Sequence, residues 1–309
     1  MADLVTTYSI VARDAASGQM GVAVQSAYIA VGAAVPWGEA GVGVVATQSF
    51  ANIDFGPEGL TMMREGVEAA EALRRLLEAD PRREARQAAL LDASGRVAAH
   101  TGTACVGAAG HLTGDAVSVQ ANMMIDDSVW PAMLAAYEGA PGDLAARLIA
   151  TLEAAEARGG DIRGRQSAAL LVVAGTPIGK PWQGRLFDLR VDDHPDPVGE
   201  LARLLRLKRA QLAQSRFVDA VTAGRMPEAM EMLQQAQELA PDADETRLST
   251  ALAASAEGRD EEARRVLREL FDRKPNKAEW MRRMIDAGYI PPQPILLETI
   301  EKAQGPRPK

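Results

Sequence analysis

The chain has 309 residues, which is too long for one average domain and about right for two. Hydrophobic residues make up 47% and charged residues 25%, as in ordinary soluble globular proteins, while an aromatic share of only 4% predicts a core of small aliphatic side chains. The formal charge of −8 disfavours nonspecific attraction to nucleic acid or to an anionic membrane, so neither is expected as a partner.

The first predicted elements form a block of strands. Residues 6–14 alternate, with Tyr8, Ile10 and Ala12 on one face and Thr7, Ser9, Val11 and Arg13 on the other, and a hairpin turn leads to a second strand over 20–26. Further strands are predicted over 29–35 and 42–47, with a turn at Pro36-Trp37-Gly38 between them. These two are apolar at nearly every position, which predicts a sheet covered on both faces.

Blocks of helices and strands then alternate along the chain. Helices are predicted over 57–65 and 67–79, strands over 86–91, 97–101 and 116–121, helices over 127–138 and 143–158, and strands over 167–174 and 185–191. Asp143 is a predicted N-cap, and Gly159-Gly160 ends the last of these helices. The order predicts an α+β domain over 1–197 with helices outside stacked antiparallel sheets.

An internal repeat marks the C-terminal part of the chain. Five residues recur after 34 positions, the period of the tetratricopeptide repeat: Gly224, Ala229, Leu233, Ala236 and Pro241 become Gly258, Ala263, Leu267, Leu270 and Pro275. Phe217 departs from the pattern, which expects a small residue there, and only two units are found. We therefore predict a small all-α tetratricopeptide-like domain over 205–309.

The single cysteine, Cys105, excludes an intrachain disulfide. No secretory signal is recognisable in the first twenty residues, and no apolar run approaches 18 residues. These features predict a cytoplasmic protein.

Several ordered motifs over roughly residues 6–200 resemble the DUF1028 family of bacterial proteins, which is assigned to the N-terminal-nucleophile (Ntn) hydrolase superfamily. They are Tyr8-Ser9-Ile10-Val11-Ala12-Arg13-Asp14, Gly21-Val22-Ala23-Val24, Val31-Gly32-Ala33 to Val35-Pro36-Trp37, Gly41-Val42-Gly43 to Ala46-Thr47-Gln48, Gly56-Pro57-Glu58-Gly59-Leu60, Gly159-Gly160-Asp161 to Gln166-Ser167-Ala168, and Val191-Asp192-Asp193-His194-Pro195-Asp196-Pro197. The resemblance implies a four-layer αββα sandwich. The segment from Trp280 to Pro292 is similar to the C-terminal module of the family, which has been described as peptidoglycan-binding.

The resemblance also implies a catalytic residue. An Ntn hydrolase uses the hydroxyl of its first residue as nucleophile and the free α-amine of that residue as base. Thr7 matches the family position, and Thr6 and Ser9 are weaker candidates. Six residues precede Thr7, so activity requires a shortened chain. In an unprocessed chain, Thr7 would be an ordinary strand residue.

Other candidate site residues follow from their chemistry. Asn122, at a strand end, could stabilise an oxyanion or simply cap a turn. In the glycine-rich loop that follows Gly159, Asp161 could orient the amine, and Arg163 and Arg165 could bind a substrate carboxylate or form structural salt bridges.

No metal or cofactor is expected. The three histidines, His100, His111 and His194, lack metal-ligand spacing, and no phosphate-binding or dinucleotide-binding motif occurs.

The sequence therefore predicts hydrolysis of a small amide or peptide whose identity it does not name. The alternative is a non-catalytic binding or scaffold protein with the same fold. The C-terminal domain is expected to contact protein, either the second copy of a homodimer or another partner, with peptidoglycan as the alternative ligand. Trp280, Met281, Met284 and Tyr289 are candidate anchors, unless they pack the last helices onto the repeats.

Overall fold

The structure is a computed structural model that describes residues 4–5, 7–290 and 292–304. It divides into two compact units between Arg203 and Leu204. The strands of the described residues all belong to the first unit, and the second unit is built of helices.

Two antiparallel sheets form the middle of the first unit. In sheet A the strand order is β1-β5-β6-β7, and β4 also pairs with β5. In sheet B the order is β11-β10-β3-β2-β9-β8. The bounds are β1 (Leu4–Val5), β4 (Pro36–Glu39), β5 (Gly43–Phe50), β6 (Arg86–Asp92) and β7 (Val97–Thr101) in sheet A, and β2 (Thr7–Arg13), β3 (Met20–Ser26), β8 (Gly110–Gly114), β9 (Val117–Asn122), β10 (Ser167–Val173) and β11 (Arg185–Val191) in sheet B.

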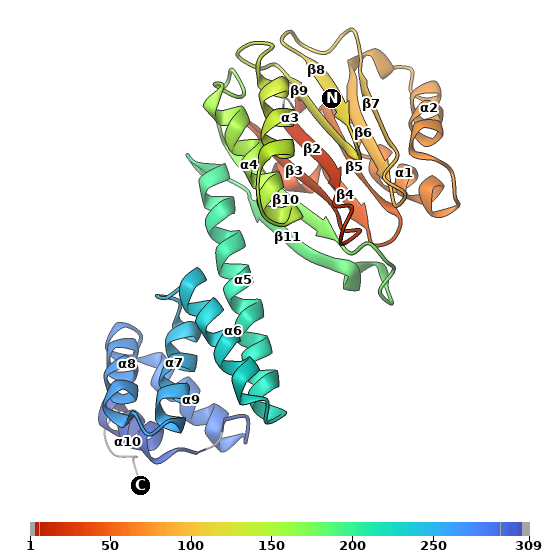
Figure 1. The fold of residues 1–309 in the computed structure, drawn as a ribbon. Helices are drawn as coiled ribbons and strands as arrows, with labels where there is room; N and C mark the ends of the chain where they lie inside the picture. The colour runs from red at the N-terminus through yellow and green to blue at the C-terminus, as the bar shows by residue number, and fades with distance from the viewer. Residues whose placement is uncertain (1–3, 6, 291, 305–309) are drawn as a thin grey trace. The chain divides into compact units, whose positions relative to one another are not determined.

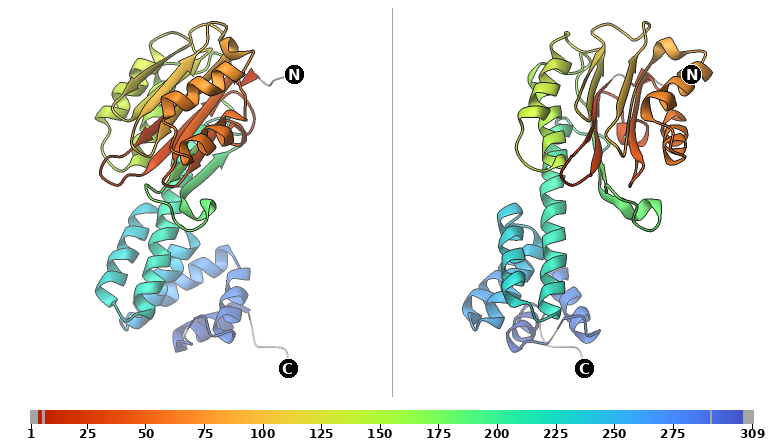
Figure 2. Two further views of the ribbon diagram at one scale, coloured as in Figure 1. Left: turned by 90° about the vertical axis from the view of Figure 1, so that its right-hand side faces the viewer. Right: turned by 45° about the vertical axis from the view of Figure 1, so that its right-hand side comes forward.

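Two pairs of helices cover the outer faces of the sheets. Helices α1 (Phe55–Arg64) and α2 (Ala69–Ala79) pack on sheet A, whereas α3 (Val129–Gly139) and α4 (Leu144–Ala157) pack on sheet B (Figure 1). The right-hand view of Figure 2 shows the helix pairs on opposite sides of the strands. The predicted four-layer αββα sandwich is therefore confirmed.

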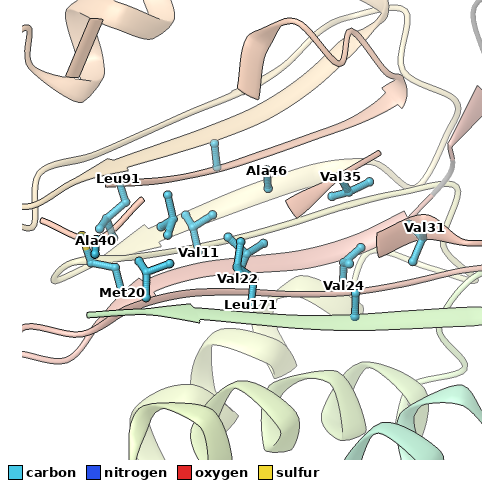
Figure 3. Packing of buried hydrophobic residues seen from close by; sticks show 14 of the residues in the cluster. Val11, Met20, Val22, Val24, Val31, Val35, Ala40, Ala46, Leu91 and Leu171 are labelled. Atoms are coloured by element: carbon cyan, nitrogen blue, oxygen red, sulfur yellow. The ribbon is translucent and has the colours of Figure 1, made fainter. Parts of the chain in front are cut away.

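The alternation predicted for the first strand determines what fills each layer. Val11 points into the space between the sheets, where it packs with Met20 and Val22 of β3 and with Leu91 of β6 (Figure 3). Tyr8 points the other way and reaches Glu156 of α4. Small aliphatic side chains fill most of the space between the sheets, as the composition predicts.

Three details of the sequence prediction are wrong. Residues 29–35 are not a strand: Ala30 has a left-handed backbone (φ 53°), and a short 3-10 helix follows over Val31–Ala33. Val31 and Val35 both reach the core from this turn, which is why the segment reads as an apolar strand. The predicted turn at residues 36–38 is instead part of β4, and the strands β1 and β8 were not predicted.

The helix signals are more accurate. The Asp143 side chain accepts a hydrogen bond from the backbone N–H of Ala146 at 3.0 Å, which confirms the predicted N-cap of α4. Gly159 and Gly160 follow this helix with φ of 94° and 55°, a backbone region that glycine adopts without steric cost.

A buried ion pair ties α2 to the start of β6. The Asp80 carboxylate accepts hydrogen bonds from Arg86 Nε at 2.7 Å and from Asn52 Nδ2 at 3.1 Å, and both side chains of the ion pair are at least 90% buried. Burial alone would raise the pKa of the Asp80 carboxyl. The hydrogen bonds from Arg86, from the backbone N–H of Arg82 and from Asn52 outweigh it, so this pKa lies below its usual value.

We expect Asp80→Asn to lower the free energy of unfolding by about 3 kcal/mol at pH 7, because the Arg86 charge stays buried without its partner. Since the folded-state pKa of Asp80 is lowered, its contribution is present above the unfolded pKa of about 4 and is lost as the pH falls through the folded value. The difference between wild type and variant in urea denaturation should therefore be constant above about pH 5 and shrink as the pH falls below about 4.

Glu71→Gln is the matched control for this prediction. Glu71 pairs with Arg74 and Arg75 on the solvent face of α2, and these hydrogen bonds lower its pKa to about 2. Because the group is exposed and screened, we expect little change in stability at 0.15 M salt. A larger effect for Glu71→Gln than for Asp80→Asn would contradict the role of burial.

Among the described residues, the second unit consists of the C-terminal part of one long helix and of five further helices, and the 34-residue repeat is visible in their geometry. Gly224 and Gly258 both have left-handed backbones, with φ of 72° and 75°. In each case the next residue donates its N–H to the carbonyl five residues earlier at 2.8 Å. The helices are α5 (Pro197–Thr222), α6 (Met226–Leu239), α7 (Asp244–Ala256), α8 (Asp260–Arg273), α9 (Asn276–Asp286) and α10 (Pro294–Gln304).

The turn recurs a third time at Gly288, with φ of 77° and the same five-residue hydrogen bond at 2.9 Å. Its spacing from Gly258 is 30 residues, so this third turn lies outside the 34-residue period and the sequence repeat has only two units. The repeated apolar residues are buried, as the repeat predicts: Ala229, Leu233 and Ala236 in α6, and Ala263, Leu267 and Leu270 in α8.

The four candidate anchors of the C-terminal unit differ in exposure. Met281 is buried in the core of α7 to α10, Met284 is half-buried, and Trp280 and Tyr289 are exposed. None of the helices in the described part of the chain has the length and apolar character needed to cross a membrane.

A chain that ends at Arg203 is expected to fold by itself. The boundary of the units falls inside α5, and Val198 and Leu201, on its first turns, are buried. A chain that ends at Pro197 lacks both side chains and should lose about 3 to 6 kcal/mol of stability. Thermal unfolding followed by circular dichroism compares the two. A chain ending at Arg203 without cooperative unfolding would mean that the two units share one core.

Candidate functional site

Thr7 lies where the chain passes from one sheet to the other. It is the first residue of β2 and pairs with Asn122 of β9 on one side and with Ser26 of β3 on the other. Val5, two residues earlier in the chain, pairs with Ser49 in sheet A. Thr7 is fully buried in this arrangement. Thr6, one of the weaker candidates, lies outside the described residues.

Four buried amide side chains from three strands surround the start of β2: Gln48 of β5, Gln87 of β6, and Gln120 and Asn122 of β9. Gln48 Nε2 and Asn122 Nδ2 both donate to Gln87 Oε1, at 2.7 and 2.9 Å. Ser9 donates to Gln48 Oε1 and accepts from Gln120 Nε2, both at 2.6 Å. The Ser9 hydroxyl is therefore held by an amide on both sides in this network.

The network continues toward the edge of the sandwich. Gln87 Nε2 donates to Thr101 Oγ1 at 2.9 Å, and Thr101 Oγ1 lies 2.8 Å from His111 Nδ1. Burial, together with the nearby His100, lowers the pKa of His111. This ring is therefore neutral at pH 7 and suited to a hydrogen bond rather than to an ion pair.

Two of the amides bind the backbone of Thr7. Gln48 Nε2 and Asn122 Nδ2 each lie 3.3 Å from the Thr7 carbonyl oxygen. In the full-length chain, Asn122 therefore points its donor at Thr7 itself. Its other polar atom, Oδ1, is buried and has no hydrogen-bond partner among the described residues. An unmatched buried acceptor beside Thr7 is costly unless it serves another donor.

Asp161 lies in line with β2, just beyond the N-terminal end of the strand at Thr7. Its backbone forms a bridge with Met124 in the continuation of β9, and its carboxylate accepts a hydrogen bond at 3.3 Å from the N–H of Ala27, which follows β3. Because β9 and β3 are the two neighbours of β2, Asp161 occupies the space where β2 would continue if the chain ran straight. Its side chain is fully buried.

The two candidate arginines are paired with carboxylates. Arg163 Nη2 lies 3.0 Å from Asp161 Oδ2, and Arg165 Nε lies 2.5 Å from Glu156 Oε2. Glu156 also accepts a hydrogen bond from Tyr8. Burial, followed by the charge of Glu156, raises the pKa of the Tyr8 hydroxyl well above its usual value. Both arginines still line a shallow surface pocket of about 340 Å³.

Backbone strain flanks the same end of the sandwich. Ser49, directly after Gln48, has φ of 68°, and Met123, directly after Asn122, has φ of 58°. A left-handed backbone costs a residue with a Cβ roughly 1 kcal/mol or more, and such residues cluster at functional sites. The strained pair follows the two amides that hold the Thr7 carbonyl.

The structure thus brings together Thr7, Asn122 and Asp161, which are 115 and 39 residues apart along the chain. Arg163 joins this group through Asp161, whereas Arg165 reaches Glu156 on the helix side of sheet B. Sequence reasoning missed Gln48, Gln87 and Gln120. For Gln48 and Gln87 the signal was a lone amide on the inward face of an otherwise apolar strand, whereas Gln120 shares its face of β9 with Ser118 and Asn122. In the part of the chain that the structure describes, no group of three acidic, histidine or cysteine side chains could hold a metal ion.

Residues 7–201 match the sequence model of a family described as a family of unknown function, DUF1028. The chain belongs to the DUF1028 family. Residues 220–282 match the model of a tetratricopeptide repeat.

A solved structure from the same family supports the assignment. The crystal structure of a DUF1028 protein from Silicibacter pomeroyi is 33% identical in sequence and superimposes with a TM-score of 0.58. The match covers 65% of this chain and 88% of that protein. None of the curated proteins matches the chain.

Proposed function

We propose that this DUF1028 protein is an Ntn-type amide hydrolase that acts after residues 1–6 are removed, with Thr7 as nucleophile. The position of Asp161 carries the proposal. A chain that begins at Thr7 has an α-ammonium group where the peptide bond to residue 6 was. A buried carboxylate directly ahead of β2 is the group that would bind and orient that amine.

Each chemical step has a candidate residue. The neutral α-amine takes the proton of the Thr7 hydroxyl while its oxygen attacks the carbonyl carbon of the substrate amide. The proton passes to the leaving amine as the C–N bond breaks, and water then hydrolyses the ester on Thr7. The Asn122 amide keeps one N–H on Gln87, and its second N–H, which donates to the Thr7 carbonyl in the unprocessed chain, is the candidate donor for the developing oxyanion. Its Oδ1 supplies an acceptor for the amine.

The full-length chain lacks two requirements of this mechanism. The Thr7 nitrogen is part of a peptide bond and cannot act as a base, and the Thr7 side chain is fully buried. Removal of residues 1–6 creates the amine and also takes away β1, which pairs with β5 just before Thr7. Processing is thus expected to generate and to uncover the nucleophile in one step.

Mass spectrometry tests the proposal. A chain released by a specific protease so that it starts at Thr7 is treated with p-nitrophenyl acetate, and peptide mapping locates the acetyl group. We expect a hydroxylamine-sensitive ester on Thr7 in the shortened chain and none in the full-length chain. Asp161→Asn should slow acetylation about 10- to 100-fold, whereas the exposed Asp115→Asn should not.

The result also decides between the enzyme and its rival. If Thr7 is never acylated and the purified protein keeps its original start by intact-mass analysis, the chain is a binding or scaffold protein that retains the fold. Equal acylation of the full-length and shortened chains would contradict the role of the α-amine.

A further inference from the structure

A second cavity opens along the edges of the two sheets, away from Thr7. It has a volume of about 270 Å³ and lies between β4 and α1 on one side and β10 and β11 on the other. β4 pairs with the first half of β5, whereas Gln48 belongs to the second half. None of the amides around Thr7 lines this cavity.

Three arginines, Arg64, Arg185 and Arg190, line the cavity. Arg185 Nη1 and Arg190 Nε donate to the same carboxylate, that of Asp188, at 2.8 and 3.1 Å. Arg64 forms a two-point ion pair with Glu39. Three guanidiniums and two carboxylates leave one net positive charge on the lining of a cavity in a chain of net charge −8.

The sharing of Asp188 leaves donors for a ligand. Each guanidinium carries five N–H groups, and Arg185 and Arg190 each donate one of them to Asp188. Both side chains are close to half exposed, so their other N–H groups are accessible to a ligand in the cavity. A planar oxyanion between two such groups can accept paired hydrogen bonds.

A rigid aromatic wall completes the cavity. The indole N–H of Trp37 donates to the Ala34 carbonyl at 3.0 Å, which fixes the orientation of the ring. The backbone of α1 packs directly on this ring, because a Cβ added at Gly56 would lie 2.3 Å from indole Cγ. Trp37 therefore offers an apolar surface that is in place before a ligand arrives.

We propose that this cavity binds a small organic anion, a carboxylate or a phosphate ester, whose oxygens accept hydrogen bonds from Arg185 and Arg190 and whose flat apolar part lies against Trp37. The charges supply attraction, and the fixed indole supplies selectivity for an anion that carries a ring. This site is independent of Thr7 and of processing.

Isothermal titration calorimetry on the full-length protein at 0.15 M salt tests the site with four compounds. They are phenyl phosphate, benzoate, inorganic phosphate and benzyl alcohol. We expect saturable binding of phenyl phosphate or benzoate, with the tighter of the two identifying the anionic group. Inorganic phosphate should bind at least about fivefold more weakly than phenyl phosphate, because it lacks the ring, and benzyl alcohol should not bind, because it lacks the charge.

Two variants are expected to change the affinity for the anion in opposite directions. Arg185→Gln should weaken binding about tenfold, whereas Asp188→Asn should tighten it several-fold, because it removes the competing carboxylate while keeping the shape. Arg75→Gln, which changes an exposed arginine on α2, is the control and should have no effect. Melting temperatures confirm that each variant is folded. No saturable heat at 10 mM of any anion, or equal effects of Arg185→Gln and Asp188→Asn, would overturn the proposal.

Discussion

In a chain that begins at residue 7, replacement of Thr7 by alanine is expected to reduce amide hydrolysis at least about a thousand-fold. The variant keeps the free α-amine and the buried Asp161 but loses the oxygen that attacks the substrate. Thr7→Ser keeps that oxygen and should retain much of the activity. Release of p-nitroaniline from a series of N-acyl p-nitroanilides measures the loss, and the most reactive member of the series serves as the reference substrate.

The control for this prediction is a threonine in the same sheet. Thr113→Ala changes an exposed residue of β8 and should leave hydrolysis unchanged. Hydrolysis that survives Thr7→Ala, or that is as fast in the full-length chain as in the shortened one, would exclude Thr7 as nucleophile.

The second large effect is on stability. Gln87 is fully buried and stands at the centre of the amide network, since it accepts from Gln48 and Asn122 and donates to Thr101. We expect Gln87→Ala to lower the free energy of unfolding by about 3 to 5 kcal/mol, because it leaves a cavity and deprives two buried donors of their acceptor. Urea denaturation of the chain ending at Arg203 measures the change without the helical unit.

Gln19→Ala provides the comparison. Gln19 is a half-buried residue of the hairpin between β2 and β3, and we expect its replacement to change stability by less than about 0.5 kcal/mol. A cost below about 1 kcal/mol for Gln87→Ala would mean that water replaces its hydrogen bonds and that the network is not a rigid support for Thr7.

Local signals in the sequence predict most of the fold. Alternation places Ser9 and Val11 on the inner face of β2, and the oxygen of Asp143 caps α4. The prediction is wrong where a buried apolar segment adopts a backbone conformation other than a strand. Val31 and Val35 are buried as expected, but they reach the core from a helical turn rather than from a strand.

The site is only partly predictable because strand pairing builds it. Thr7 and Asn122 are assigned from motif and chemistry, but that they are direct neighbours follows from the register between β2 and β9. The place of Asp161 ahead of β2 depends on a single bridge to Met124, which has no sequence signature. The sequence does not show whether an arginine binds a substrate carboxylate or a carboxylate of the protein. In the structure, Arg163 and Arg165 both form ion pairs with carboxylates of the protein.

The amide network also selects one alignment of the strands. A shift of β6 by one residue against its neighbours would turn Gln87 toward α2 and place it among apolar side chains such as Val45 and Leu90. An amide buried there without partners costs roughly 2 to 7 kcal/mol. The Val, Ala and Leu side chains at the other end of the sandwich are too alike to impose such a penalty. The four amides therefore favour one register of the strands over the others. A chain with apolar residues of similar size in their place is expected to stay compact but to lose its unique strand alignment.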